Sequence, residues 1–139
     1  MNLIDTSAWI DYLRGTGSRA AATVHALIEG SGPTASAQSI VCCEPIAMEL
    51  LAGADRDVVH DRLEIMVNGL PTLRLEPDLD YRSAASIFRA VRRSGRTVRS
   101  LNDCLIAAIA IRNDATLVHK DAAFEAIADV TSLRARSLR

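Results

Sequence analysis

The chain has 139 residues, of which 49% are hydrophobic and 24% charged, and its formal net charge is −1. This length suits one domain, 1–139, with a real buried core and an ordinary globular composition. The longest apolar run, 104–111, is far shorter than the roughly 20 residues of a membrane helix, and no basic region precedes the acid at position 5, as a secretory signal would require. We therefore expect a cytoplasmic protein without a membrane segment.

Apolar runs and helical spacing predict alternating strands and helices along the chain. In chain order they are a strand at 2–4, helices at 7–13 and 19–29, a loop at Gly30–Ser39, a strand at 40–43, helices at 45–51 and 57–68, a strand at 72–75, helices at 78–94 and 101–112, a strand at 116–119, a helix at 122–128 and an edge strand at 130–133. This alternation predicts an α/β fold, a three-layer α/β/α sandwich with a mostly parallel sheet of four or five strands.

Four acidic residues stand out by their predicted positions. Asp5 and Asp121 lie at or just beyond the carboxyl ends of strands, Glu49 lies on the helix after the second strand, and Asp103 lies at the start of a helix. In open α/β sheets ligands gather at the carboxyl edge of the strands. We therefore expect these four side chains to converge there.

Glu49 is the most informative of the four, because it shares a helix stripe with Ile46 and Leu50, which suit burial. Asp103 repeats this pattern on the helix 101–112. Burying an unpaired carboxylate costs several kcal/mol or forces it to take up a proton. Each inward acid therefore needs a cation or an arginine partner, and the sequence leaves both open.

Three of the acids also have purely structural explanations. The Ser-x-x-Asp spacing that ends at Asp103 is that of a capping box, and Asp121 precedes a helix that it can cap. Asp5 can stabilise a turn while Ser7 caps the first helix. Capping does not explain Glu49, whereas one cation site explains all four acids.

The chemistry of the donors selects the cation. Carboxylates without nearby histidine or cysteine ligands suit the hard cations Mg²⁺ or Mn²⁺ and disfavour zinc. The three cysteines are odd in number and lack CxxC spacing, so they indicate neither a disulfide framework nor a zinc site. Such an ion activates a bound water and neutralises charge on a phosphodiester. The sequence leaves open whether one or two ions bind.

Four segments resemble the motifs of the PIN-domain nucleases, specifically the VapC-type toxins of bacterial toxin–antitoxin pairs. They are 3–8 around Asp5, 45–51 around Glu49, 102–107 around Asp103, and 118–121, which ends at Asp121 and is followed by Phe124. The order of the four motifs carries the resemblance, which covers essentially the whole chain. The loop Gly30–Ser39 departs from it by being longer than expected.

The resemblance implies an Mg²⁺- or Mn²⁺-dependent endoribonuclease that cleaves a tRNA or rRNA loop. It implies a homodimer and a cognate antitoxin that lays a segment along a hydrophobic groove, for which Trp9, Tyr12 and Leu13 are candidates unless they are plain core residues. The residues implicated are Asp5, Glu49, Asp103 and Asp121 as catalytic metal ligands, with Thr6, Ser7 and Asn102 beside them.

A basic segment suggests how RNA is held. Six arginines and no acid lie between Arg82 and Arg99, so this segment carries +6 and the remainder −7. A basic patch on a near-neutral protein suits a polyanion, although a solvated helix face explains it too. The candidates for contacts to RNA phosphates are Arg92, Arg93, Arg96 and Arg99.

Two other functions compete with this reading. A receiver-type signalling domain is also α/β with clustered acids, but it needs an acidic pair after its first strand and an aspartate ending its third. This chain has a lone Asp5 and nothing equivalent near Leu75. A non-catalytic module that uses the acidic cluster to bind an ion or a partner is the other alternative, although such a module has no need to gather like charges.

Overall fold

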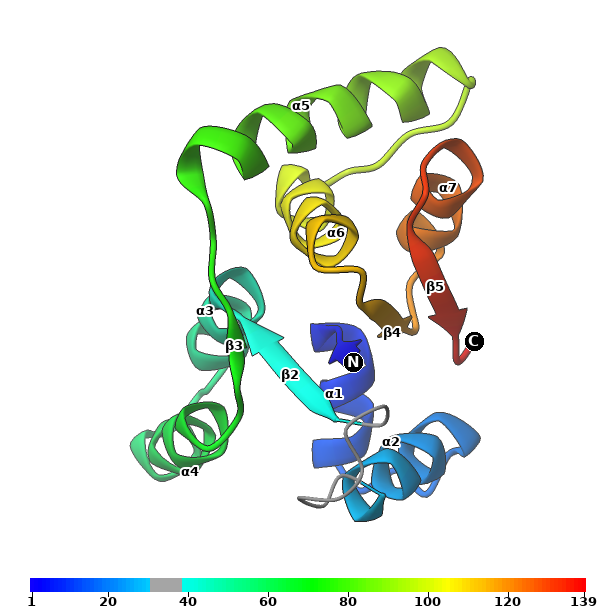
Figure 1. Ribbon diagram of the computed structural model, residues 1–139. Coiled ribbons are helices and arrows are strands. Elements are labelled where there is room, and N and C mark those ends of the chain that lie inside the picture. The colour runs from blue at the N-terminus through cyan, green and yellow to red at the C-terminus, as the bar shows by residue number, and fades with distance from the viewer. Residues whose placement is uncertain (31–38) are drawn as a thin grey trace.

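The computed structural model describes residues 1–30 and 39–139, so the predicted loop Gly30–Ser39 falls largely outside the described residues (Figure 1). The elements are β1 Asn2–Ile4, α1 Thr6–Leu13, α2 Arg19–Glu29, β2 Ile40–Cys43, α3 Glu44–Ala52, α4 Asp57–Asn68, β3 Thr72–Leu73, α5 Pro77–Arg93, α6 Leu101–Arg112, β4 Thr116–His119, α7 Ala122–Val130 and β5 Arg134–Ser137. The predicted α/β fold is confirmed.

The five strands form one sheet in the order β3-β2-β1-β4-β5, and all the pairings are parallel. Helices α5 and α6 lie on one side of this sheet and α1 and α2 on the other (Figure 1). The central strand β1 is wholly buried, and so is most of α6, from Cys104 to Ala110. Because the strands run parallel, their carboxyl ends lie at one edge of the sheet, and this edge receives Asp5 and Asp121.

Two strand predictions need correction. Residues 130–133 do not form the last strand, because Val130 ends α7 and a turn follows, in which the Thr131 hydroxyl accepts from the amide of Leu133 at 3.2 Å. The last strand is β5, whose residues are all exposed. At β3 the strand stops after Leu73, since the amide of Leu75 donates to the side chain of Glu44 at 2.9 Å.

No helix in residues 1–30 and 39–139 is long and apolar enough to cross a membrane.

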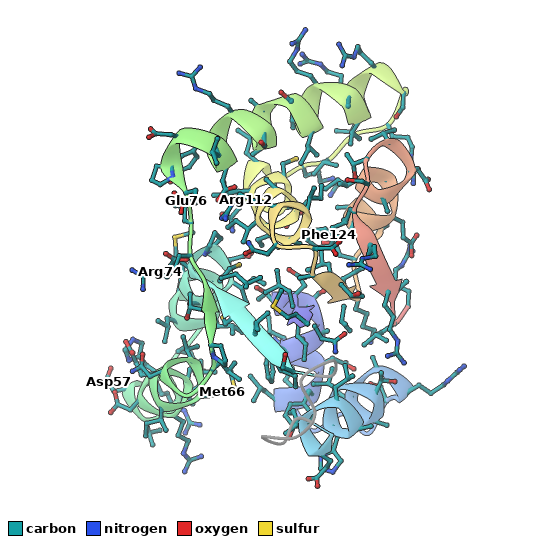
Figure 2. All side chains as sticks on the ribbon, viewed as in Figure 1. Asp57, Met66, Arg74, Glu76, Arg112 and Phe124 are labelled. Carbon is teal, nitrogen blue, oxygen red and sulfur yellow. The ribbon has the colours of Figure 1, made fainter. Side chains whose placement is uncertain are left out.

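An ion pair between the buried Asp80 and Arg112, which is labelled in Figure 2, fastens α5 to α6. The Asp80 side chain is 1% exposed, and it accepts from Arg112 Nε at 2.9 Å and Nη2 at 2.8 Å. Burial raises the pKa of Asp80, but hydrogen bonds from Arg112 and the Glu76 amide outweigh burial, so its pKa lies below the ordinary value. The pair therefore stabilises the packing of these two helices.

We expect Asp80→Ala to lower the free energy of unfolding by roughly 2 kcal/mol, because Arg112 and the amide of Glu76 lose the charged acceptor of their hydrogen bonds. Urea denaturation at neutral pH measures this loss. Because the folded pKa is lowered, the contribution is present above the unfolded pKa of about 4 and is lost as pH falls through the folded value. Asp78→Ala, an exposed acid in the same first turn, is the matched control, and equal losses in both variants would contradict the assignment.

Candidate active site

The four acids predicted to converge lie together at the carboxyl edge of the sheet. Asp5 directly follows β1, and its amide donates to the carbonyl of Val118 in β4 at 2.9 Å. Asp121 caps α7 two residues after β4 ends. Glu49 reaches the same place from α3 and Asp103 from the first turn of α6, and the charges of Asp5, Asp121 and Glu49 each raise the pKa of Asp103. The structure therefore brings all four carboxylates into one electrostatic cluster.

Asp5 is held rigidly at the start of α1. Its side chain is buried, and Oδ2 accepts from the Ser7 amide at 3.0 Å and the Ser7 hydroxyl at 2.6 Å. Asp5 is therefore the N-cap of α1, and the alternative in which Ser7 caps that helix is wrong. Burial raises the pKa of Asp5, the bonds from Ser7 lower it, and the net pKa is raised.

Glu49 has polar neighbours but forms no ion pair with a basic side chain in the described part of the chain. The Thr6 hydroxyl donates to its Oε1 at 3.3 Å. Burial raises the pKa of Glu49, as do Asp5 and Asp121, while Thr6 and Asn102 lower it. Asn102 lies close enough to act on Glu49, yet its buried Nδ2 makes no hydrogen bond of ordinary geometry within the described residues. Asn102 is therefore placed beside the Glu49 carboxylate rather than toward solvent.

Asp103 is the least satisfied of the four. Ser100 makes no side-chain cap on α6, so the capping-box explanation is not realised. Burial first, and then Asp5, Asp121 and Glu49, raise the pKa of Asp103 to about 7. Within residues 1–30 and 39–139, no basic side chain forms an ion pair with any of the four acids, so arginine partners do not explain them either.

Asp121 has two roles. Its Oδ1 accepts from the amide of Ala123 at 2.9 Å, so the capping explanation holds for this acid. Its own amide donates to Nδ1 of His119 at 3.1 Å. No basic side chain in residues 1–30 and 39–139 forms an ion pair with Asp121, so capping does not remove it from the cluster.

The donor set suits a hard cation. Four carboxylates with the hydroxyls of Thr6 and Ser7 provide only oxygen atoms, the ligands that Mg²⁺ and Mn²⁺ prefer. In the part of the chain that the structure describes, no group of three Asp, Glu, His or Cys side chains is close enough to coordinate one ion directly. This spacing fits Mg²⁺, which keeps several waters and is bound through one or two carboxylates.

An apolar groove of about 620 Å³ leads up to Glu49 between α1, α3 and α4. Leu13 lines the groove, as predicted, but Trp9 is 2% exposed and packs in the core, so its assignment to the groove is wrong. Tyr12 packs partly buried against the core rather than lining the groove. The groove is also lined by apolar residues that were not predicted from the sequence to belong to it: Ile10, Leu50, Val59, Leu63 and Met66.

A family model described as the PIN domain matches residues 3–130. The chain belongs to the PIN-domain family. It is 55% identical, over 139 residues and the full length of both chains, to VapC ribonuclease Mb1587 of Mycobacterium bovis and to ribonuclease VapC11 of Mycobacterium tuberculosis, so within the family it belongs with the VapC-type proteins.

Solved structures confirm the fold of this PIN domain. VapBC2 from Rickettsia felis, bound to a DNA fragment from its promoter, matches with a TM-score of 0.73 over 99% of this chain and 98% of that chain, at 15% identity. VapBC from Salmonella typhimurium, also bound to DNA, matches with a TM-score of 0.70 over 98% and 96%, at 16% identity. Such low identity shows the shared fold alone.

The predicted arginines of this PIN domain differ in their surroundings. Arg96 pairs with Asp129 near the end of α7, about 12 Å along the helix from Asp121 at 1.5 Å per residue. The guanidinium of Arg92 lies 5.5 Å from the ring centre of Phe88. Arg93 and Arg99 are exposed and form no ion pair among the described residues. These last two are the freest to contact another molecule.

Sequence reasoning missed His119, which is wholly buried at the end of β4. Its Nδ1 accepts from the Asp121 amide, so its Nε2 carries the proton, and that atom is buried without a partner among the described residues. Burial lowers the pKa of His119, which keeps the ring neutral. His119 therefore positions Asp121, a role that a single histidine in an apolar strand does not signal.

Proposed function

We propose that this PIN-domain protein is a metal-dependent endoribonuclease toxin that hydrolyses a phosphodiester of a structured RNA, a tRNA or an rRNA loop. The observation that carries the proposal is the set of four carboxylates, which have no basic partner among the described residues and of which Asp103 has a pKa raised to about 7. Gathering like charges destabilises a fold, and a divalent cation compensates for it. The names of its full-length relatives support RNA as the substrate.

Asp5, Glu49, Asp103 and Asp121 would hold Mg²⁺ or Mn²⁺. When bound, such an ion lowers the pKa of a water and neutralises charge on the phosphodiester. Ser7 fixes the Asp5 carboxylate through two hydrogen bonds, and Thr6 orients Glu49. Asn102, which lowers the pKa of Glu49, would help to keep that carboxylate ionised. These groups are placed before the substrate arrives, so little reorganisation is needed during the reaction.

The experiment that tests this function is incubation of the purified protein with total bacterial RNA and either Mg²⁺ or Mn²⁺, with EDTA as the control. We expect discrete fragments with metal and none with EDTA. Sequencing of the new 5′ ends identifies the RNA and the position of the cut. Intact RNA under every metal condition would contradict the proposed activity.

The PIN-domain groove is proposed as the docking site of a cognate antitoxin. Its floor is apolar and one end is formed by Glu49, so a bound segment reaches the acids. The structural relatives include complexes named VapBC, which supports a protein partner here. A basic side chain at the end of that segment would neutralise the acids and exclude the metal.

We expect Leu13→Asp to weaken antitoxin binding at least tenfold, because it places a charge in the apolar groove at a side chain that is 46% exposed before binding. Isothermal titration calorimetry with the cognate antitoxin measures the change. Leu79→Asp is the control, because Leu79 is an exposed leucine on α5 outside the groove. Equal affinities for both variants would place the partner elsewhere.

We also propose that the protein forms a homodimer. Met48 on α3 and Leu101 on α6 are apolar and more than half exposed, and these two helices pack together. They provide apolar surface for a second copy. Sedimentation equilibrium measures the mass, and a monomer at micromolar concentration would contradict the dimer.

A further inference from the structure

A second pocket, of about 440 Å³, lies between the beginning of α2 and the end of β5. Figure 1 shows the C-terminal end of the chain close to α2 on this side of the molecule. Among the described residues, its wall contains four cationic side chains and no acidic one. The cationic residues are Arg19, Lys120, Arg136 and Arg139, and the other lining residues are Ser18, Ala20, Thr23, Ser137 and Leu138. We call this hollow the basic pocket.

The basic pocket adjoins the acidic cluster. Lys120 directly precedes Asp121 in the chain, and its amide donates to the hydroxyl of Ser7 at 3.0 Å. The same hydroxyl donates to Asp5 at 2.6 Å. Two hydrogen bonds therefore connect the wall of the pocket to the carboxylates. A nucleic-acid strand cut at the acids has its neighbouring phosphates within reach of this wall.

Two of the four cations are held in place and two are free. Lys120 Nζ pairs with Asp11 at 3.3 Å, and Arg139 pairs with Glu125 at 2.8 Å. Arg19 and Arg136 are exposed and have no ion pair among the described residues. The wall thus combines two oriented positive charges with two that are available to an anion.

The composition of the wall determines which part of a nucleic acid it takes. None of the lining residues is aromatic, so the pocket offers no surface on which a base can stack. Lysine and arginine bind phosphate oxygens strongly, and arginine does so with two parallel hydrogen bonds. The pocket therefore fits the sugar–phosphate backbone rather than a base.

We propose that the basic pocket binds a backbone phosphate of the RNA beside the phosphodiester that is cleaved. This proposal rests on the proposed endoribonuclease function. In this proposal the RNA lies over the β4–β5 side of the carboxylate edge and does not use the arginines of α5. Arg19 and Arg136 contact the phosphate, while Lys120 and Arg139 provide a fixed positive field behind it.

The test uses equilibrium binding of fluorescently labelled, unfractionated tRNA to the full-length protein in EDTA, where no cleavage occurs, over a series of salt concentrations. We expect Arg19→Ala and Arg136→Ala each to weaken binding by roughly three- to tenfold. Each is expected to reduce the slope of log K against log salt by about 0.7 to 1, the value for one lost phosphate contact. Arg136→Lys retains the charge and is expected to recover most of the slope.

Arg134→Ala is the matched control, because Arg134 lies on the same strand, pairs with Asp114 and does not line the pocket. If Arg19→Ala and Arg136→Ala change affinity and slope no more than Arg134→Ala, the basic pocket does not hold RNA, while metal-dependent cleavage by the wild type still supports the proposed function. Pocket-dependent binding of tRNA by a wild type that leaves total bacterial RNA intact with Mg²⁺ and with Mn²⁺ contradicts the function alone. A wild type that does not bind tRNA overturns the pocket.

Discussion

Asp103→Asn and Glu49→Gln are each expected to reduce the rate of RNA cleavage by at least about 100-fold while leaving the fold intact. Both changes keep the size of the side chain and remove one negative charge from the proposed metal site. A loss of this size corresponds to about 3 kcal/mol of transition-state stabilisation. Initial cleavage rates with saturating Mg²⁺, together with circular dichroism, measure activity and fold separately.

Asp57→Asn is the matched control for Asp103→Asn, because Asp57 is also an acid in the first turn of a helix but is exposed on α4. It is expected to cleave RNA at the wild-type rate. If Asp103→Asn or Glu49→Gln retains a rate within a few-fold of wild type, the residue concerned is not part of the catalytic site.

The metal-free protein is expected to be destabilised by its own acids, so that Asp103→Asn raises its melting temperature by roughly 5 °C at neutral pH. Burial and three neighbouring carboxylates raise the folded pKa of Asp103 to about 7, above an unfolded value of about 4. An acid whose folded pKa is raised favours folding below its unfolded pKa, and this contribution is lost as pH rises through the folded value. Thermal melts in EDTA at about pH 5 and about pH 8 measure the effect.

The difference in melting temperature between Asp103→Asn and wild type is expected to increase from about pH 5 to about pH 8. It is expected to decrease when Mn²⁺ stabilises the wild type. Asp5→Asn, whose side chain still caps α1 because asparagine is a good N-cap, is expected to raise the metal-free melting temperature as well and to shrink the shift caused by Mn²⁺. A lower melting temperature for both variants, with no shift by Mn²⁺ in wild type, would mean that these acids are structural.

The sequence predicted most of the fold because its signals are local. Helices over 19–29, 57–68 and 101–112 and strands over 40–43 and 116–119 coincide with the observed elements. In these segments the apolar spacing agrees with the side chains that are buried, and flanking residues such as Gly69 agree with the observed helix ends. The strand β5 was missed because all of its residues are exposed, so only its pairing with β4 defines it.

The sequence likewise predicted one part of the candidate site and could not predict another. Motif order and an acid on an apolar helix face pointed to Glu49 and Asp103, and the structure brings them together with Asp5 and Asp121. The sequence could not decide whether Asp103 belongs to a capping box, because that depends on the orientation of Ser100. Nor could it find the basic pocket, since α2 and β5 are more than 100 residues apart in the chain.

The most direct test of the proposed metal site is calorimetric titration of Mn²⁺ into the metal-free protein at pH 7 in buffers of different ionisation enthalpy. Binding to the four carboxylates is predicted to release protons, because burial and the neighbouring carboxylates raise the pKa of Asp103 to about 7 and this acid must ionise to bind a cation. Asp103→Asn is predicted to bind much more weakly and to release almost none. No detectable binding by wild type, or equal binding by Asp103→Asn, would contradict the proposal that these acids form a metal site.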